Sequence, residues 1–192
     1  LGLLGSRADH VIFDSADLSS TEYADWRMEY ASFRNTNLDQ ARLEDVFVKN
    51  GDFRGAIFDH IKMTHTRLEM CNLAFVRMHN ADLQAVAMPG SSLLNASFSN
   101  ALLPEIDLHG ADLRLAGFAK VDLSQASLAG ADCRGTDFSQ ADMSQAALVE
   151  ADCRAANFGS TDLSQAKLDR ADVSFARFAG ANLLDADFVD ST

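Results

Sequence analysis

A bulky apolar residue recurs at every fifth position of this chain, and the frame does not shift over nearly the whole sequence. The run extends from Phe13 to Phe188, and each of its 36 positions holds Leu, Phe, Met, Tyr, Val or Cys. We label the five positions of each pentad a to e, with the bulky residue at c. Position a is then almost always small, most often Ala, as at Ala111 and Ala151. A repeat this strict predicts a single regular architecture.

A period of five fits neither an α-helix nor a long β-strand. On a helix, a step of five residues rotates successive side chains by ~140°, so the bulky residues would scatter around the axis. A long strand needs a period of two throughout. Positions a and c are two residues apart, so a short extended stretch directs both to one side and b to the other. Positions d and e must then turn the chain so that the next a and c face inward again.

The residue types at d and e are those of turns. Six of the eleven glycines and five asparagines lie at e, and both prolines lie at d. Pro followed by Gly, as in Pro89-Gly90, favours a type II turn, in which the second central residue needs a positive φ. The pattern therefore predicts a turn at the end of each pentad.

A longer echo of twenty residues indicates how many pentads close one coil. The segment Asp-Leu/Met-Ser-Gln-Ala begins at Asp122, Asp142 and Asp162, and Phe98 and Phe118 begin a column of phenylalanines with the same spacing. Twenty residues are four pentads, so we expect four-sided coils, about nine of them. Stacked at a strand spacing of ~4.8 Å, they would make a rod about 40 Å long. Such a stack buries a continuous core that no single coil could bury alone.

Several pentads match the repeat of a known family as they stand. They resemble the pentapeptide repeat family, whose pattern is roughly Ala-Asp/Asn-Leu/Phe-x-x, and the resemblance covers residues 11–191. It implies an all-β fold, a right-handed quadrilateral β-helix. The clearest matches are Ala-Asp-Leu at 81–83 and 111–113, Ala-Asn-Leu at 181–183 and Ala-Asp-Phe at 186–188.

The frame leaves no room for a linker, so we expect one solenoid domain at residues 11–192 after a lead-in or capping segment at residues 1–10. Residues 11–80 depart most from the family pattern. Trp26 and Ile61 occupy position a there, and we expect such bulky residues to widen their coils locally.

Net charge narrows the class of partner. The chain carries −12, and residues 101–192 hold 15 acidic against 7 basic side chains. This balance argues against direct binding of nucleic acid through a basic surface, whereas an acidic rod suits a basic protein partner.

The sequence contains no apolar run of about 18 residues, so we predict no membrane-spanning helix. It begins with Leu1 rather than Met and shows no secretory signal. We expect a cytoplasmic protein, and the missing Met raises the alternative that the chain is a fragment of a longer or secreted protein.

Three cysteines, Cys71, Cys133 and Cys153, lie at inward positions. Cys133 and Cys153 stack one coil apart, at a separation that suits a disulfide. We interpret them as packed thiols, because buried Cys behaves as a small hydrophobe. No His shares their column, so a metal site is not predicted.

Outward acidic residues form two columns of different character. The first interleaves Asp at b with Arg at d, and we expect the arginines to neutralise the stacked carboxylates. The second, an acidic stripe, has no basic residue between 122 and 165 and could dock a basic partner. Alternatively, the acidic stripe is present because Asp at b is the family consensus and keeps this face of the sheet soluble. The first column is Asp112, Arg114, Asp132, Arg134, Asp152, Arg154 and Asp172, and the acidic stripe is Asp82, Asp122, Asp142 and Asp162.

Outward apolar residues are further candidates for partner contact. Phe75, Leu94 and Leu115 fall in neighbouring columns and should form a small apolar patch; single candidates are Phe47, Leu102 and Phe175. An open solenoid end exposes core and strand edges. We therefore predict a homodimer through the C-terminal coil, with Leu184, Phe188 and Val189 at the dimer end.

Catalysis has little support in the sequence. We predict that none of the five histidines pairs with a Ser or Cys nucleophile within one outward column, and His60 and His65 lie on different edges of the coil. Coils without insertions also lack the loops that usually carry active sites. We predict no enzyme, no cofactor and no metal.

Three functions remain. The first is a non-catalytic, rigid scaffold for protein interaction. The second follows from the resemblance: some family members resemble B-form DNA in shape and charge and bind DNA gyrase, which gives quinolone resistance or protection from a toxin. Those members usually carry a projecting loop and a C-terminal dimerisation helix, and this frame has neither. The third is a spacer or targeting domain of a larger protein, such as a secreted effector.

Overall fold

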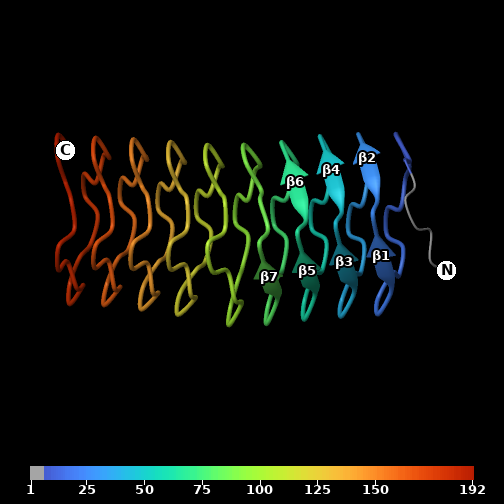
Figure 1. Cartoon of the computed structure of the whole chain (residues 1–192), viewed down its shortest axis with the longest axis horizontal. Coiled ribbons are helices and arrows are strands. Elements are labelled where there is room, and N and C mark those ends of the chain that lie inside the picture. The colour runs from blue at the N-terminus through green and yellow to red at the C-terminus, as the bar shows by residue number, and fades with distance from the viewer. Residues whose placement is uncertain (1–6) are drawn as a thin grey trace.

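The computed structural model describes residues 7–192, and none of these residues is helical. Seven strands of three residues each lie in the N-terminal half, where they form two parallel sheets on two sides of the coil (Figure 1). The four-stranded sheet is β1 (Glu22–Ala24), β3 (Arg42–Glu44), β5 (Lys62–Thr64) and β7 (Asp82–Gln84), and the three-stranded sheet is β2 (Arg27–Glu29), β4 (Phe47–Lys49) and β6 (Arg67–Glu69).

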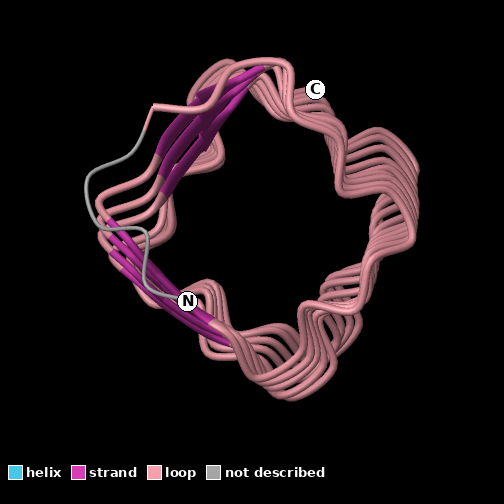
Figure 2. Cartoon of the chain, turned by 90° about the vertical axis from the view of Figure 1, so that its right-hand side faces the viewer, coloured by secondary structure: helices cyan, strands magenta, loops and turns pink. Residues whose placement is uncertain are grey.

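Every pairing joins residues twenty apart. Glu22 pairs with Arg42 in the first sheet, and single parallel bridges continue this register from Arg7↔Arg27 to Lys167↔Asp187. Figure 2 shows the coils superposed around one common interior when viewed along the stack. The predicted all-β solenoid is therefore confirmed. The count of about nine coils, the four-sided cross-section and the right-handed sense stay predictions.

The predicted lead-in segment is residues 1–10, and residues 1–6 lie outside the described part of the chain. Residues 7–10 already bond to the next coil, through Ala8 N to Arg27 O at 3.0 Å and His10 N to Glu29 O at 2.9 Å. No described segment is a helix that could cross a membrane.

Position e has the left-handed backbone that the turn residues predicted. Every e residue from His10 to Asp190 has a positive φ, and only six of them are glycines. Gly55, with φ 67°, is one place where glycine matters sterically, because an added Cβ would lie 2.6 Å from Asn35 Oδ1.

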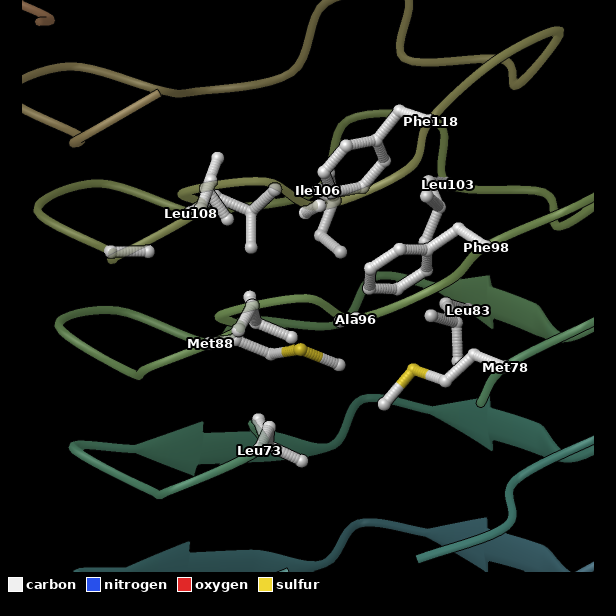
Figure 3. Packing of buried hydrophobic residues seen from close by; sticks show 14 of the residues in the cluster. Leu73, Met78, Leu83, Met88, Ala96, Phe98, Leu103, Ile106, Leu108 and Phe118 are labelled. Atoms are coloured by element: carbon white, nitrogen blue, oxygen red, sulfur yellow. The ribbon is translucent and has the colours of Figure 1, made fainter. Parts of the chain in front are cut away.

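Positions a and c fill the interior, as predicted. They are buried with few exceptions from Trp26 to Ala171. Phenylalanines at c stack along the axis, with ring centroids 4.4 Å apart between Phe98 and Phe118 (Figure 3). Near Trp26 the interior contains an apolar cavity of about 20 Å³. The local widening expected at Trp26 and Ile61 stays a prediction.

The cysteines are buried free thiols in the described structure, which agrees with the interpretation as packed side chains. A hydrogen bond with Cys153, together with burial, raises the pKa of Cys133 well above its usual range. Burial likewise raises the pKa of Cys71 to about 12. The thiols of Cys71 and Cys133 are therefore protonated at neutral pH.

Candidate functional site: the outward faces of the coils

The backbone N–H at position d explains why Asp and Asn are common at b. The ladder and turn bonds use the N–H groups of a, b, c and e, as shown by Ala16 N to Phe13 O at 3.0 Å and Phe33 N to Asp52 O at 2.7 Å. The d N–H is left over, and a buried or half-buried donor needs an acceptor. Asp122 Oδ1 accepts from Ser124 N at 2.9 Å, which is an Asx-turn.

Asparagine does the same work at this position. Asn157 Oδ1 accepts from Gly159 N at 3.1 Å, and Asn182 Oδ1 accepts from Leu184 N at 3.2 Å. Where the b residue accepts this bond, its side-chain oxygen is sufficient, and the negative charge of Asp is additional to it. The reading of Asp at b as a solubilising consensus residue missed this backbone role.

In the Asp/Arg column, each Arg side chain at d lies between two b side chains: the one in its own pentad and the one in the next coil. Arg114 Nε is 2.7 Å from Asp112 Oδ1 and 3.6 Å from Asp132 Oδ2. Arg134 and Arg154 repeat this geometry one and two coils further on. The predicted neutralised Asp/Arg column is confirmed.

These contacts shift the pKa values of both partners in the directions expected for an ion pair. The hydrogen bond from Arg114 lowers the pKa of Asp112, although burial opposes it, and the same bond raises the pKa of Arg114. Both the Asp and the Arg side chains therefore stay charged, and their opposite charges cancel over most of the column.

The acidic stripe is different. Asp122, Asp142 and Asp162 are in direct register, and none of the three is in an ion pair with any described residue. Each binds one backbone N–H through Oδ1, as Asp142 does with Ser144 N at 2.9 Å. The bond from Ser164 N lowers the pKa of Asp162. We call these three residues the carboxylate column.

Asp82, the fourth residue of the stripe, is separated from this column. Leu102 stands between Asp82 and Asp122 in the register, and Lys62 Nζ is 3.6 Å from Asp82 Oδ2. Within the acidic stripe, the unpaired charge is therefore confined to the three residues of the carboxylate column.

The apolar patch lies along a corner of the coil. Phe75 and Leu115 are 58% and 59% exposed, whereas Leu94 is half-buried. Phe175 belongs to the same e column and is 90% exposed. Of the other single candidates, Leu102 is exposed. Phe47 is half-buried, and the Arg27 guanidinium carbon lies over its ring, 5.9 Å from the ring centroid.

Phe75 also borders a surface hollow that sequence reasoning missed. Its other lining residues are Arg34, Asn35, Arg54 and Gly55. The sequence feature that could have indicated this hollow is Gly55, which stands between larger residues in the e column. The sequence alone does not show which side chains surround Gly55.

At the C-terminal coil, Leu184 and Val189 are exposed at 64% and 58%. Phe188 is half-buried and packs edge-on against Phe178, with centroids 6.1 Å apart. The structure thus places all three residues of the predicted dimer end on the last described coil.

One histidine pairs with a serine, a contact that sequence reasoning missed because it compared residues within single columns. His79 Nε2 is 2.9 Å from Ser97 Oγ, and His79 Nδ1 is 3.9 Å from Asp59 Oδ1. The backbone N–H groups of Ser97 and Phe98 donate to ladder carbonyls at 3.0 Å, so they are not free to stabilise an oxyanion. That the protein is not an enzyme stays a prediction.

His60 is held by neighbouring polar residues. Its Nδ1 is 3.0 Å from Asp39 Oδ1, and its Nε2 is 3.3 Å from Asn80 Nδ2. Within residues 7–192, no group of three or more His, Cys, Asp or Glu side chains is placed to hold a metal ion.

Comparisons with known proteins agree with the fold. A family model described as pentapeptide repeats matches the chain in 8 copies, at residues 27–59, 91–130, 116–152, 146–183 and 156–192. Comparison of the sequence with curated proteins gave no match.

Two solved structures illustrate the likeness. The chain is similar to HetL, a pentapeptide repeat protein involved in heterocyst differentiation regulation in Nostoc sp. strain PCC 7120, with a TM-score of 0.63, 22% identity and coverage of 97% of this chain and 86% of that one. It is also similar to trypsin-treated QnrB1, a plasmid-mediated fluoroquinolone resistance protein, with a TM-score of 0.59, 17% identity and coverage of 94% and 91%. At these identities the likeness concerns the fold.

Proposed function

The chain belongs to the pentapeptide repeat family, and we propose that it is a non-catalytic, rigid scaffold that binds a basic protein partner through the carboxylate column. One observation carries this proposal: the three carboxylates add a charge that the fold does not need. Asn meets the same backbone requirement at Asn157 and Asn182.

Keeping three aspartates in register also has a cost. Their side chains repeat once per coil, at ~4.8 Å, and like charges directly opposite each other on neighbouring strands repel. No basic residue offsets them, and the neighbouring d and e residues are Ser and Gln. A rigid row of unpaired negative charge is complementary to a row of Lys or Arg on a partner and speeds the encounter with it.

A second candidate is an acidic DNA mimic that binds DNA gyrase. The fold likeness to QnrB1, a fluoroquinolone resistance protein, and the acidic C-terminal half support it. The carboxylate column repeats at ~4.8 Å, and the phosphates of one DNA strand advance by ~3.4 Å each along the helix axis. A DNA-binding groove would therefore contact a row of negative charges like that of one DNA strand, but more widely spaced.

The proposal is tested with two triple variants of equal charge change. D122N/D142N/D162N removes the carboxylate column but keeps each backbone acceptor, and D112N/D132N/D152N makes the same change in the neutralised column. Binding to an oligolysine peptide should weaken about tenfold in the first variant and become less salt-dependent, with a smaller change in the second. Equal losses in both variants would contradict the proposal.

Gyrase supercoiling, measured with and without a quinolone, tests the second candidate. The DNA mimic predicts that the protein changes supercoiling or quinolone inhibition and that D122N/D142N/D162N loses the effect. No effect at tens of micromolar protein would remove gyrase as the partner and leave the scaffold proposal standing.

A further inference from the structure

The hollow beside Phe75 precedes the carboxylate column by more than two coils of the twenty-residue register, so it forms a separate surface. Its floor is Gly55, which has no side chain, and Asn35 leans over that floor from the preceding coil. Arg34 and Arg54 flank the floor at position d, and the Phe75 ring closes the far side.

Phe75 has a backbone conformation that does not favour a bulky side chain. Its φ is 61°, a left-handed value that bulky L-residues adopt with strain. Its side chain is 58% exposed, so burial does not offset the strain. Asn35, Gly55, Asn95 and Gly135 of the same column tolerate this backbone, whereas Leu115, Ala155 and Phe175 share the strain of Phe75. What distinguishes Phe75 is its place in the hollow beside two arginines, where an exposed aromatic ring indicates a contact surface.

The two arginines keep unused donors. Arg34 Nε binds Asp52 Oδ2 at 2.7 Å, and Arg54 binds the same carboxylate through Nε and Nη2 at 2.9 and 2.7 Å. A guanidinium has five N–H donors, and the rest of these have no hydrogen-bond partner among residues 7–192. Both side chains are about half-exposed, at 51% and 46%, so a second anion can reach them.

We propose that this hollow binds a peptide segment of a protein partner in which an acidic side chain is followed by an apolar one. The carboxylate accepts hydrogen bonds from Arg34 and Arg54, as guanidinium groups favour, and the apolar side chain packs on the Phe75 ring over Gly55. The inference does not depend on the carboxylate column or its partner.

A single-stranded nucleic acid would offer similar chemistry, a phosphate beside a base. The net charge of −12 and the neighbouring carboxylates of Asp14 and Asp52 repel a polyanion much more than they repel one carboxylate. The observations therefore favour the peptide.

The test uses the blocked peptide acetyl-(Glu-Leu)₃-amide as a probe, with acetyl-(Gln-Leu)₃-amide and an oligothymidylate as comparisons. Binding is followed by fluorescence and by shifts of the backbone amide signals of Asn35, Gly55 and Phe75. We expect the Glu peptide to bind with a Kd of about 10⁻⁴ M and the Gln peptide about tenfold more weakly. Absence of shifts at about 1 mM peptide, equal binding of the two peptides, or tighter binding of the oligothymidylate at the same amides would overturn the proposal.

Three variants separate binding from folding. Phe75→Asn should weaken the Glu peptide about tenfold without lowering the melting temperature, because Asn adopts a left-handed backbone more readily. Gly55→Asn should block the floor of the hollow by displacing only the flexible Asn35 amide. Phe175→Asn, in the same column but outside the hollow, is the matched control and should leave the affinity unchanged. Unchanged affinity in Phe75→Asn, or a lowered melting temperature, would contradict the inference.

Discussion

Position e holds a left-handed backbone at every described pentad, yet most of its residues carry a side chain. Glycine adopts this conformation freely, whereas other L-residues bring Cβ close to the following carbonyl. The turn therefore forms because the neighbouring coils hold it, through bonds such as Ser15 N to Arg34 O at 2.8 Å, and the local residue preference is secondary.

This reasoning gives a prediction at Ala155, an exposed e residue with a φ of 58°. Ala155→Gly should raise the free energy of unfolding by about 1 kcal/mol, because it removes the Cβ clash. Ala147→Gly is the control, at an extended b position that pairs with Ser127 and Lys167, and should lower it by about 0.5–1 kcal/mol. Urea denaturation of both variants measures this. A shift in the same direction for both would contradict the strain argument.

At the level of the coil, contacts between outward side chains tie one turn of the solenoid to the next. Arg34 lies one coil before Asp52, and Arg54 lies in the same pentad as Asp52. Burial is the largest single influence on Asp52 and raises its pKa, but hydrogen bonds from Arg54 and Arg34 outweigh it and lower the pKa to about 2.

The pH dependence of stability follows from this shift. Because the folded pKa lies below the unfolded value of about 4, the charged form stabilises the folded chain above that pH. The contribution is lost as the pH falls toward about 2. It should be about 1–2 kcal/mol, since the half-exposed arginines are partly screened by solvent.

The variant D52N keeps an acceptor for Arg54 N but removes the charge. Between about pH 4 and pH 2, its free energy of unfolding should fall less than that of the natural sequence, as measured by denaturant titration at each pH. Parallel curves for the two proteins would show that the Arg34–Asp52–Arg54 contact does not contribute to acid stability.

On the scale of the whole molecule, one core runs the length of the stack, and the last coil covers it incompletely. Phe178 and Phe188 are only half-buried there, and Leu184 and Val189 are exposed. Apolar area that remains in contact with water favours association. The homodimer through this coil stays a prediction for the 192-residue chain.

A charge placed at the dimer end tests that prediction. Leu184→Asp should convert a dimer to a monomer in light scattering at micromolar concentration, because a carboxylate would be buried without a partner. Leu102→Asp changes another exposed Leu, on a side face, and should leave the mass unchanged. A monomer for the natural sequence would refute the dimer.

Much of this molecule was predictable from the residues alone. The five-residue period predicted which side chains are buried, because a and c alternate with b along a short extended stretch. Gly and Asn predicted the turns, and the twenty-residue echo predicted the register seen in Asp122↔Asp142. These properties depend on neighbours in the sequence or on exact repetition, and both can be read directly.

Only the tertiary structure decided what each outward side chain contacts. A d residue lies beside the b residue eighteen positions later because that b residue stands one coil beyond the b residue of its own pentad, and only the stacked arrangement of the coils shows this contact. This arrangement brings His79 to Ser97 and Arg34 to Asp52, and the stacking of the coils opens the hollow over Gly55. The sequence by itself determined the repeat, its buried face and the excess of acidic residues. The stacking of the coils determined which of those charges are paired and which remain free to meet a partner.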